Sequence, residues 1–435
     1  MRFGPSIIGV VFAFTSAAAT IQSPVTFNQD VAPVLAKNCQ GCHRPGEAAP
    51  FSLLTYEQAR PWAKAIKEAV LLKKMPPWFA DPHYGKFSND RSLSQKEIDT
   101  LVAWADAGAL QGDPNIVPAQ ASFVEGWRIP KPDVVFQMPN AFEVPADGTI
   151  EYQYIVVPTG FTEDKWVQFA EARPGNRALV HHIIAFIREP GSKWLKDAKP
   201  GVPFVPVKKK DGDDDDSGEQ GEFLAGYAPG TVPEMMAPGQ AKLVKAGSDI
   251  VFQMHYTANR TAGTDQSKVG LVFAKEPPRE RVFTLAAAND KFKIPAGDPN
   301  YQVDSSLELG TQVTLNGMLP HMHLRGKDFE YRVVYPTGET ETLLRVPAYS
   351  FSWQLSYYPV KPLVLPKGTK IECTAHFDNS PNNPSNPDAT KEVAWGDQSW
   401  DEMMIGFFSV SFDANMPIKN LFPEEKKEEK KATDD

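Results

Sequence analysis

Residues 150–156 read Ile-Glu-Tyr-Gln-Tyr-Ile-Val, and residues 252–256 read Phe-Gln-Met-His-Tyr. Large apolar residues recur at every second position of each segment, which is the pattern of a half-buried β-strand. Similar short segments, separated by Pro, Gly, Asn and Asp, continue from about residue 131 to about residue 415. That stretch is too long for a single sandwich of about 100 residues. The sequence therefore predicts two antiparallel, jelly-roll-like β-sandwiches, over residues 131–285 and 286–420.

Residues 24–112 carry a different pattern, with apolar residues at helical spacing. Asn28 and Thr55 each precede one such stretch and are candidate N-cap residues. Ser94 and Glu97 have the spacing of a capping box ahead of a third stretch. These signals predict a small α-helical domain of three helices in front of the sandwiches.

Four further segments carry neither of these patterns, and one of them is an insert within the first sandwich. Residues 113–130 contain prolines without periodicity, so we expect a linker. Residues 208–222 and 421–435 are rich in charge and predict a solvated loop and a disordered tail; the loop departs from the EF-hand spacing of a calcium site. Residues 1–19 combine an early positive charge, a short apolar core and an Ala-rich end, which predicts a signal peptide and export to the periplasm or the cell exterior. After its cleavage we expect no membrane span.

The composition narrows the class of protein. The 435 residues include 39 Pro, 3 Cys and 8 His, and the net charge is −9. The negative charge and the lack of a basic patch argue against a nucleic-acid partner. Three cysteines exclude a disulfide scaffold. Because histidine is scarce, the few positions where it occurs are informative.

Residues Cys39, Cys42 and His43 form the motif C-x-x-C-H, the attachment signature of a c-type haem. The two thiols can form thioethers with the haem vinyl groups, and the adjacent imidazole can reach the iron. No second C-x-x-C exists to complete a zinc site. The other axial ligand should be a Met or a His. The three-helix order and the Met-Pro loop resemble a small class I cytochrome c, which favours Met75 over His83 as that ligand and predicts one covalent haem.

Five other histidines fall into three motifs: the pair His181-His182, His255 in the second strand quoted above, and His321-Met322-His323. Side chains alternate along a strand, so His-x-His places both imidazoles on one face. The adjacent His181 and His182 can share a metal only at a strand end, an edge or a twist. Imidazole suits zinc, copper, iron and nickel, so the spacing alone does not choose the metal.

Between about residues 131 and 415 the chain resembles the type II copper, ascorbate-dependent monooxygenases, the family of peptidylglycine α-hydroxylating monooxygenase and dopamine β-monooxygenase. The resemblance rests on four motifs in the same order: Val180-His181-His182, Gln253-Met254-His255-Tyr256, His321-Met322-His323-Leu324 with Gly326-Lys327, and Asp401-Glu402-Met403.

The resemblance implies two coppers, one in each sandwich. The electron-transfer copper would have the ligands His181, His182 and His255. The copper at which oxygen is activated would have the ligands His321, His323 and Met403, and Met404 is then the neighbour that faces the other way.

Three positions depart from the peptidylglycine enzyme. Leu319 stands where that enzyme has the Arg that anchors the substrate carboxylate, and Ile405 and Phe407 replace the Asn and Tyr that help it. The resemblance therefore implies a less polar substrate than a peptidylglycine.

Taken together, these features predict an exported copper-dependent monooxygenase that inserts one atom of O₂ into a C–H bond of a small organic substrate. The resemblance implies that two electrons must be supplied. We expect a relay from an external donor to the haem, then to the first copper and then to the second. The alternative is a non-catalytic electron-transfer or copper-binding protein on the same scaffold. A third possibility makes the cytochrome a docking module for a membrane partner and the sandwiches a sensor.

Overall fold

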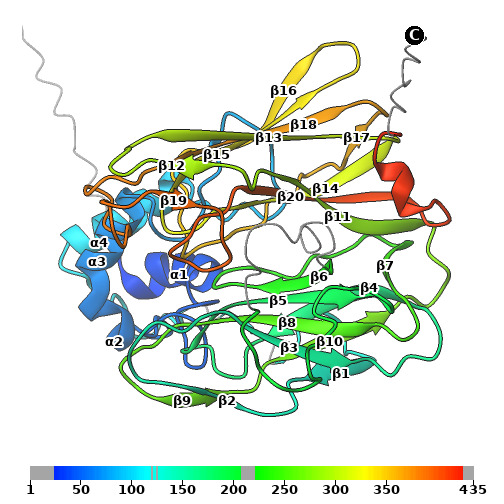
Figure 1. The fold of residues 1–435 in the computed structure, drawn as a ribbon. Helices are drawn as coiled ribbons and strands as arrows, with labels where there is room; N and C mark the ends of the chain where they lie inside the picture. Colours follow the sequence, from blue (N-terminus) through cyan, green and yellow to red (C-terminus); the bar gives the residue numbers. More distant parts are fainter. Residues whose placement is uncertain (1–23, 119–120, 124–125, 207–220, 425–435) are drawn as a thin grey trace, which may run out of the picture.

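A computed structural model of the chain describes residues 24–118, 121–123, 126–206 and 221–424. The protein is mostly β, with several antiparallel sheets and a small N-terminal helical region (Figure 1). No helix in these ranges has the length and apolar character needed to cross a membrane. The expected signal peptide, residues 208–220 of the charged insert and residues 425–435 of the tail lie outside the described residues.

The helical region contains three helical segments, as predicted. Their elements are η1 (Phe27–Val31) with α1 (Ala32–Asn38), then α2 (Tyr56–Ala59), η2 (Arg60–Trp62) and α3 (Ala63–Leu71), and finally α4 (Gln95–Asp106).

Two of the three predicted N-caps are confirmed. The Thr55 side chain accepts a hydrogen bond from the backbone N–H of Gln58, and Ser94 and Glu97 form the predicted capping box. The expectation for Asn28 is wrong, because the first helix begins at Phe27 and Thr26 is its N-cap residue. Asn28 is buried inside that helix, and its side-chain amide donates to the backbone carbonyl of Asp113 at 2.9 Å.

The first half of the β region forms two facing sheets. One has the strand order β3 (Gln153–Pro158), β8 (Asp249–Tyr256), β5 (Val180–Arg188) and β6 (Glu222–Tyr227). The other has the order β1 (Val134–Gln137), β10 (Lys268–Phe273), β4 (Lys165–Arg173) and β7 (Gln240–Val244). The predicted alternation on β8 is confirmed, since Phe252 and Met254 are fully buried in the core between these sheets. A short pair, β2 (Phe142–Val144) and β9 (Gly263–Asp265), lies beside them.

The second half repeats this arrangement. One sheet has the order β13 (Tyr301–Glu308), β18 (Lys370–Phe377), β15 (Gly326–Val334) and β16 (Thr340–Val346). The other has the order β11 (Glu280–Ala288), β20 (Ile405–Asp413), β14 (Val313–His321) and β17 (Leu363–Leu365). The remaining elements are the pair β12 (Lys293–Ile294) and β19 (Val393–Ala394), and the 3-10 helix η3 (Ile418–Leu421), whose Leu421 is buried in this core.

One sheet of each half is joined to the other through β7 and β11. These two strands pair in parallel, with Gln240 opposite Glu280 and Ala241 opposite Arg281. The result is a single sheet of eight strands that runs through both halves of the molecule. The expected domain boundary at residue 285 falls inside β11, the strand that makes this connection.

The loop between α3 and α4 attaches the helical region to the second half. Phe87 forms a β-bridge with Pro359, and the N–H of Ser88 donates to the carbonyl of Tyr358 at 2.8 Å. The ring of Trp78 packs against Tyr357 with centroids 5.0 Å apart. This attachment matters because residues 349–360 also reach the histidine clusters described next.

Candidate metal centre

His181, His182 and His255 form one cluster. Each offers a ring nitrogen, and these three atoms lie within 4.8 Å of one another. His182 and His255 are opposite each other on the paired strands β5 and β8, and the register shifts between Val180 and His182. Such a β-bulge adds one residue to a strand and re-aims its side chain. The bulge is the physical reason why two adjacent histidines on one strand reach the same point.

The nitrogen atoms of this cluster converge. Nδ1 of His182 lies 3.4 Å from Nδ1 of His181 and 3.3 Å from Nδ1 of His255. Burial lowers the pKa of His181 to about 4 and that of His255 to about 3, and it lowers the pKa of His182 as well. Neutral imidazoles are the form that binds metals. This largely buried group of three histidines could therefore hold a metal ion such as copper.

His321 and His323 form a second group at the end of β14, with ring centroids 5.2 Å apart. Nδ1 of His321 is 2.7 Å from Oε1 of Gln354, and Nδ1 of His323 is 3.3 Å from the carbonyl oxygen of Asp401. Because both partners are acceptors, both Nδ1 atoms carry the proton and both Nε2 atoms have a free lone pair. Nε2 of His323 is buried and has no hydrogen-bond partner. A metal ion fits this arrangement, since it would satisfy that nitrogen.

Glu402 ties the segment that contains Met403 to this second group. Its carboxylate accepts hydrogen bonds from the backbone N–H groups of His323, at 2.9 Å, and Arg325, at 2.6 Å. Met403 follows directly in the chain and is buried, but it does not belong to the main apolar core. Met404 does belong to that core, which agrees with its predicted orientation to the other side.

Two aromatic rings lie between the two groups of histidines. The Phe351 ring is stacked on His181 with centroids 5.3 Å apart, and it also lies 5.8 Å from His323. The Tyr152 ring lies 4.7 Å from His255 and 6.5 Å from His323. Each of these two rings therefore lies next to both groups of histidines, although the groups come from different halves of the chain.

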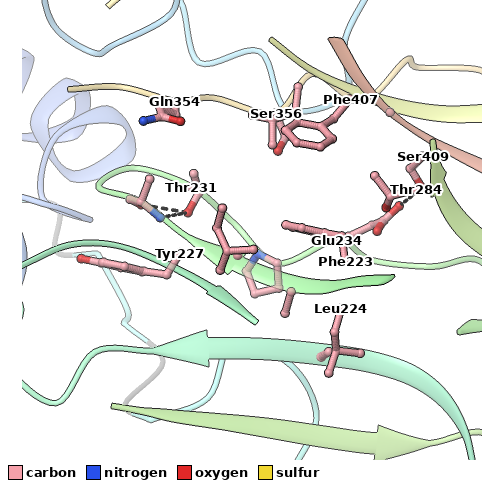
Figure 2. A pocket seen from close by; sticks show the side chains of 18 of the residues that line it. Phe223, Leu224, Tyr227, Thr231, Glu234, Thr284, Gln354, Ser356, Phe407 and Ser409 are labelled. Carbon is pink, nitrogen blue, oxygen red and sulfur yellow. Dashed lines mark hydrogen bonds between the residues drawn. The ribbon is translucent and has the colours of Figure 1, made fainter. Parts of the chain in front are cut away.

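A cavity opens between the two halves beside these histidines (Figure 2). Its unfilled space is about 1100 Å³ when the open solvent at its mouth is included, and its walls include His182 and His321. Most of the other walls are apolar and include Phe223, Leu224, Met236, Met318, Phe407 and Phe408. Leu319, which stands where the resemblance would have an Arg, is another wall residue. Small-molecule sites have this character, a mainly apolar cavity with a few convergent polar groups.

The C-x-x-C-H motif lies in the turn after α1. Cys39 and Cys42 are free thiols, and burial raises the pKa of Cys39 to about 12. The His43 ring packs on Phe51, and its Nδ1 is 3.3 Å from the carbonyl of that residue. Met75 lies in the turn after α3, where its N–H donates to the carbonyl of Ala69. No described interaction joins Met75 to His43, so their pairing on one haem stays a prediction.

His83, His376 and Cys373 belong to neither group of histidines. His83 is exposed and 2.6 Å from an oxygen of Asp81. His376, on β18, is paired with Asp328 at 2.7 Å. Cys373 is a buried thiol whose pKa is raised by burial.

Sequence reasoning missed the supporting residues of both groups. Gln354, Phe351 and Tyr152 occur in segments without any motif, and Tyr152 stands out only as one apolar position in a strand pattern. Glu402 belongs to the Asp-Glu-Met motif, but its role as an acceptor has no signal in the sequence.

Comparison with known proteins identifies no family. No family model matches the chain, and no curated protein matches it either. Solved structures that show some likeness include that of infectious bursal disease virus, Gx strain, with a TM-score of 0.20 and 10% identity over 65% of this chain and 73% of that one. The VP2 subviral particle of the same virus gives a TM-score of 0.20 and 10% identity over 67% and 74% of the two chains. Likeness at this level carries no argument about function.

Proposed function

We propose that this protein is an exported copper-dependent monooxygenase with a c-type haem as its source of electrons, and that it hydroxylates a C–H bond of a small organic molecule. The observation that carries the proposal is the meeting of two groups of histidines at one apolar cavity. One group comes from each half of the β region, and His182 and His321 both line the cavity.

The donor sets differ in a way that suits two different coppers. The first group offers three imidazoles whose Nδ1 atoms converge. The second group would combine the Nε2 atoms of His321 and His323 with the thioether of Met403. A thioether is a soft ligand that favours Cu(I), whereas imidazoles accept both oxidation states. Bound copper would supply one-electron redox chemistry and the activation of O₂ next to the substrate.

The protein's own residues provide orientation and a dry environment. Gln354 and the carbonyl of Asp401 hold the imidazoles of His321 and His323 in one tautomer. The phenol of Tyr152 is buried and lies 3.3 Å from the hydroxyl of Ser399, and burial raises its pKa, so it stays neutral. The apolar walls exclude water from the place where the C–H bond of a substrate would lie.

The position of the helical region supports an electron-supplying role. Glu47, five residues after Cys42, forms an ion pair with Arg177 at 2.8 Å, four residues before His181. The α3–α4 loop is attached to residues 356–360 on the other side. The helical region that carries the haem motif is thus attached to both halves of the β region, and fusion gives such a donor a high effective concentration.

The test is metal and haem analysis of the exported protein, followed by measurement of O₂ consumption with a reductant and a panel of apolar substrates. The proposal expects one covalent haem, two coppers and substrate-dependent O₂ uptake. Met403→Ala should abolish the uptake, whereas His376→Ala, in the same sandwich, should retain it. One copper per chain, zinc in place of copper, or full uptake by Met403→Ala would contradict the proposal; the last result would favour a non-catalytic electron carrier.

A further inference from the structure

The cavity beside the histidines has a polar end of unusual composition. Among the described residues that line it, Glu234 is the only acidic one, and no Lys or Arg lines it. Glu234 lies with Thr284 and Ser409 at one end of the view, and Gln354 lies at the other (Figure 2). The hydroxyl of Ser409, on β20, donates to Oε1 of Glu234 at 2.6 Å. A residue of the second half therefore fixes this carboxylate of the first half.

Lys242, which does not line the cavity, already balances the charge of Glu234. Nζ of Lys242 lies 3.6 Å from Oε2 of Glu234, and the Lys242 side chain is fully buried. The ammonium also donates to the carbonyl oxygens of Phe223, at 3.0 Å, and Leu224, at 3.3 Å. Because its N–H donors are occupied in this way, Lys242 neutralises the carboxylate through its charge and offers a ligand no free donor.

This pairing decides which ligands the polar end accepts. A ligand ammonium would place a second cation beside Lys242, and a ligand carboxylate would face Glu234 directly; either leaves a charge uncompensated in an apolar cavity. An uncharged hydroxyl can instead donate to a free lone pair of the Glu234 carboxylate, which is a charge-assisted hydrogen bond.

We propose that the substrate is an uncharged, mostly apolar molecule with an aromatic or similarly bulky body and one hydroxyl group. The hydroxyl binds Glu234, and the apolar body extends along Phe223, Met318 and Phe407 towards His321. That this ligand is a substrate depends on the proposed monooxygenase function. That the cavity prefers such a ligand depends only on the apolar walls and on the Glu234–Lys242 pair.

Four ligands with one naphthalene skeleton test the preference: 2-naphthalenemethanol, its methyl ether, 2-naphthylmethylammonium and 2-naphthoate. Their dissociation constants are measured by calorimetry with the full-length protein, as purified and again after copper removal. The alcohol should bind about two- to tenfold tighter than the ether, the value of one hydrogen bond. The two ions should bind at least about tenfold more weakly than the alcohol.

Two variants and a control locate the effect. Glu234→Gln leaves Lys242 without its counter-charge, so the alcohol should lose its advantage over the ether and the naphthoate should become the preferred ligand. Leu319→Trp adds bulk to the cavity wall and should abolish binding of all four ligands, with the circular dichroism spectrum unchanged. Met235→Ala alters an exposed neighbour of Glu234 outside the cavity and should leave all four constants unchanged.

Each result has a defined meaning. Preference for either ion, equal binding of alcohol and ether, or no binding of any of the four would overturn the inference. Unchanged binding by Leu319→Trp would also overturn it, because the ligands would then lie elsewhere. If the alcohol preference holds but the protein takes up no copper or consumes no O₂, the inference on binding stands and the proposed function fails.

Discussion

The side-chain carbonyl of Gln354 accepts a hydrogen bond from Nδ1 of His321 at 2.7 Å. This bond fixes the tautomer of the imidazole and leaves Nε2 with a free lone pair. Gln354 lies two residues before Ser356, whose carbonyl accepts a hydrogen bond from the side chain of Asn89 in the α3–α4 loop. The segment that attaches the helical region thus also orients a candidate ligand of the metal.

Gln354→Ala should weaken copper binding at the second group of histidines. A group that orients a metal-bound histidine typically contributes 10- to 100-fold, so we expect a loss of affinity of about that size. Competition with a copper chelator measures it. Gln302→Ala, an exposed position on β13, is the control and should bind copper normally. Equal affinities of the two variants would show that the hydrogen bond does not position a ligand.

His255→Ala should remove one copper of the two and leave the haem in place. The first group would then offer only two imidazoles, His181 and His182, from a single strand. Elemental analysis after dialysis checks this, and His376→Ala, which removes a histidine paired with Asp328, should retain both coppers. A His255→Ala protein with both coppers would refute the assignment of this ligand.

The copper-free protein should lose stability as the pH falls from about 6.5 to about 4. Burial lowers the pKa of His181 and of His321 from 6.5 to about 4, so in this range the unfolded chain binds more protons than the folded one. The contribution of these two neutral histidines to the free energy of unfolding is therefore complete above pH 6.5 and is lost as the pH approaches 4. Each pKa unit is worth about 1.4 kcal/mol, so melting temperatures should fall by at least about 2 °C. His181→Gln should flatten the profile measured by calorimetry; an unchanged profile would contradict the role of burial.

Glu402→Gln should destabilise the protein by about 2–4 kcal/mol. The change replaces an acceptor of two backbone N–H groups, those of His323 and Arg325, by a side chain with its own donors. Denaturant unfolding measures the loss. The control is Glu372→Gln, which removes a partly exposed ion pair with Arg332 and should cost less than about 1 kcal/mol. Equal losses would show that the buried carboxylate has no special role.

Cys39→Ser with Cys42→Ser should abolish covalent haem while both coppers remain. The two thiols are the only groups of the motif that can form thioether bonds. Haem staining after denaturing electrophoresis provides the measurement, and Cys373→Ser, at the buried thiol of β18, should retain the stain. Haem that stays covalently attached without Cys39 and Cys42 would disprove the motif's assignment.

The strand pattern could be predicted from the sequence because burial on one face imposes a period of two. That rule correctly placed Phe252 and Met254 inward and separated them from His255. The rule also raised the difficulty of His181 and His182, which it places on opposite faces. The bulge that resolves the difficulty depends on the register against β8, and register is a property of two strands that one segment does not encode.

The remaining site residues depend on contacts between distant segments. Gln354 and Glu234 both lie outside the strands, so no periodicity marks them. Glu234 acquires its character from Lys242 and Ser409, the second of which is 175 residues away. The first helix is another case in which a distant contact overrides a local signal. Asn28 is a suitable N-cap by residue type, but its side chain instead donates to the backbone carbonyl of Asp113.

The parallel pairing of β7 with β11 has a mechanical consequence. The two halves cannot rotate apart as rigid bodies about a hinge unless the backbone pairs of Gln240 with Glu280 and Ala241 with Arg281 separate first. A ligand can therefore reach the histidines without separation of the halves, through the open mouth of the cavity that His182 and His321 line. The eight-stranded sheet that both halves share therefore fixes the spacing of the two groups of histidines.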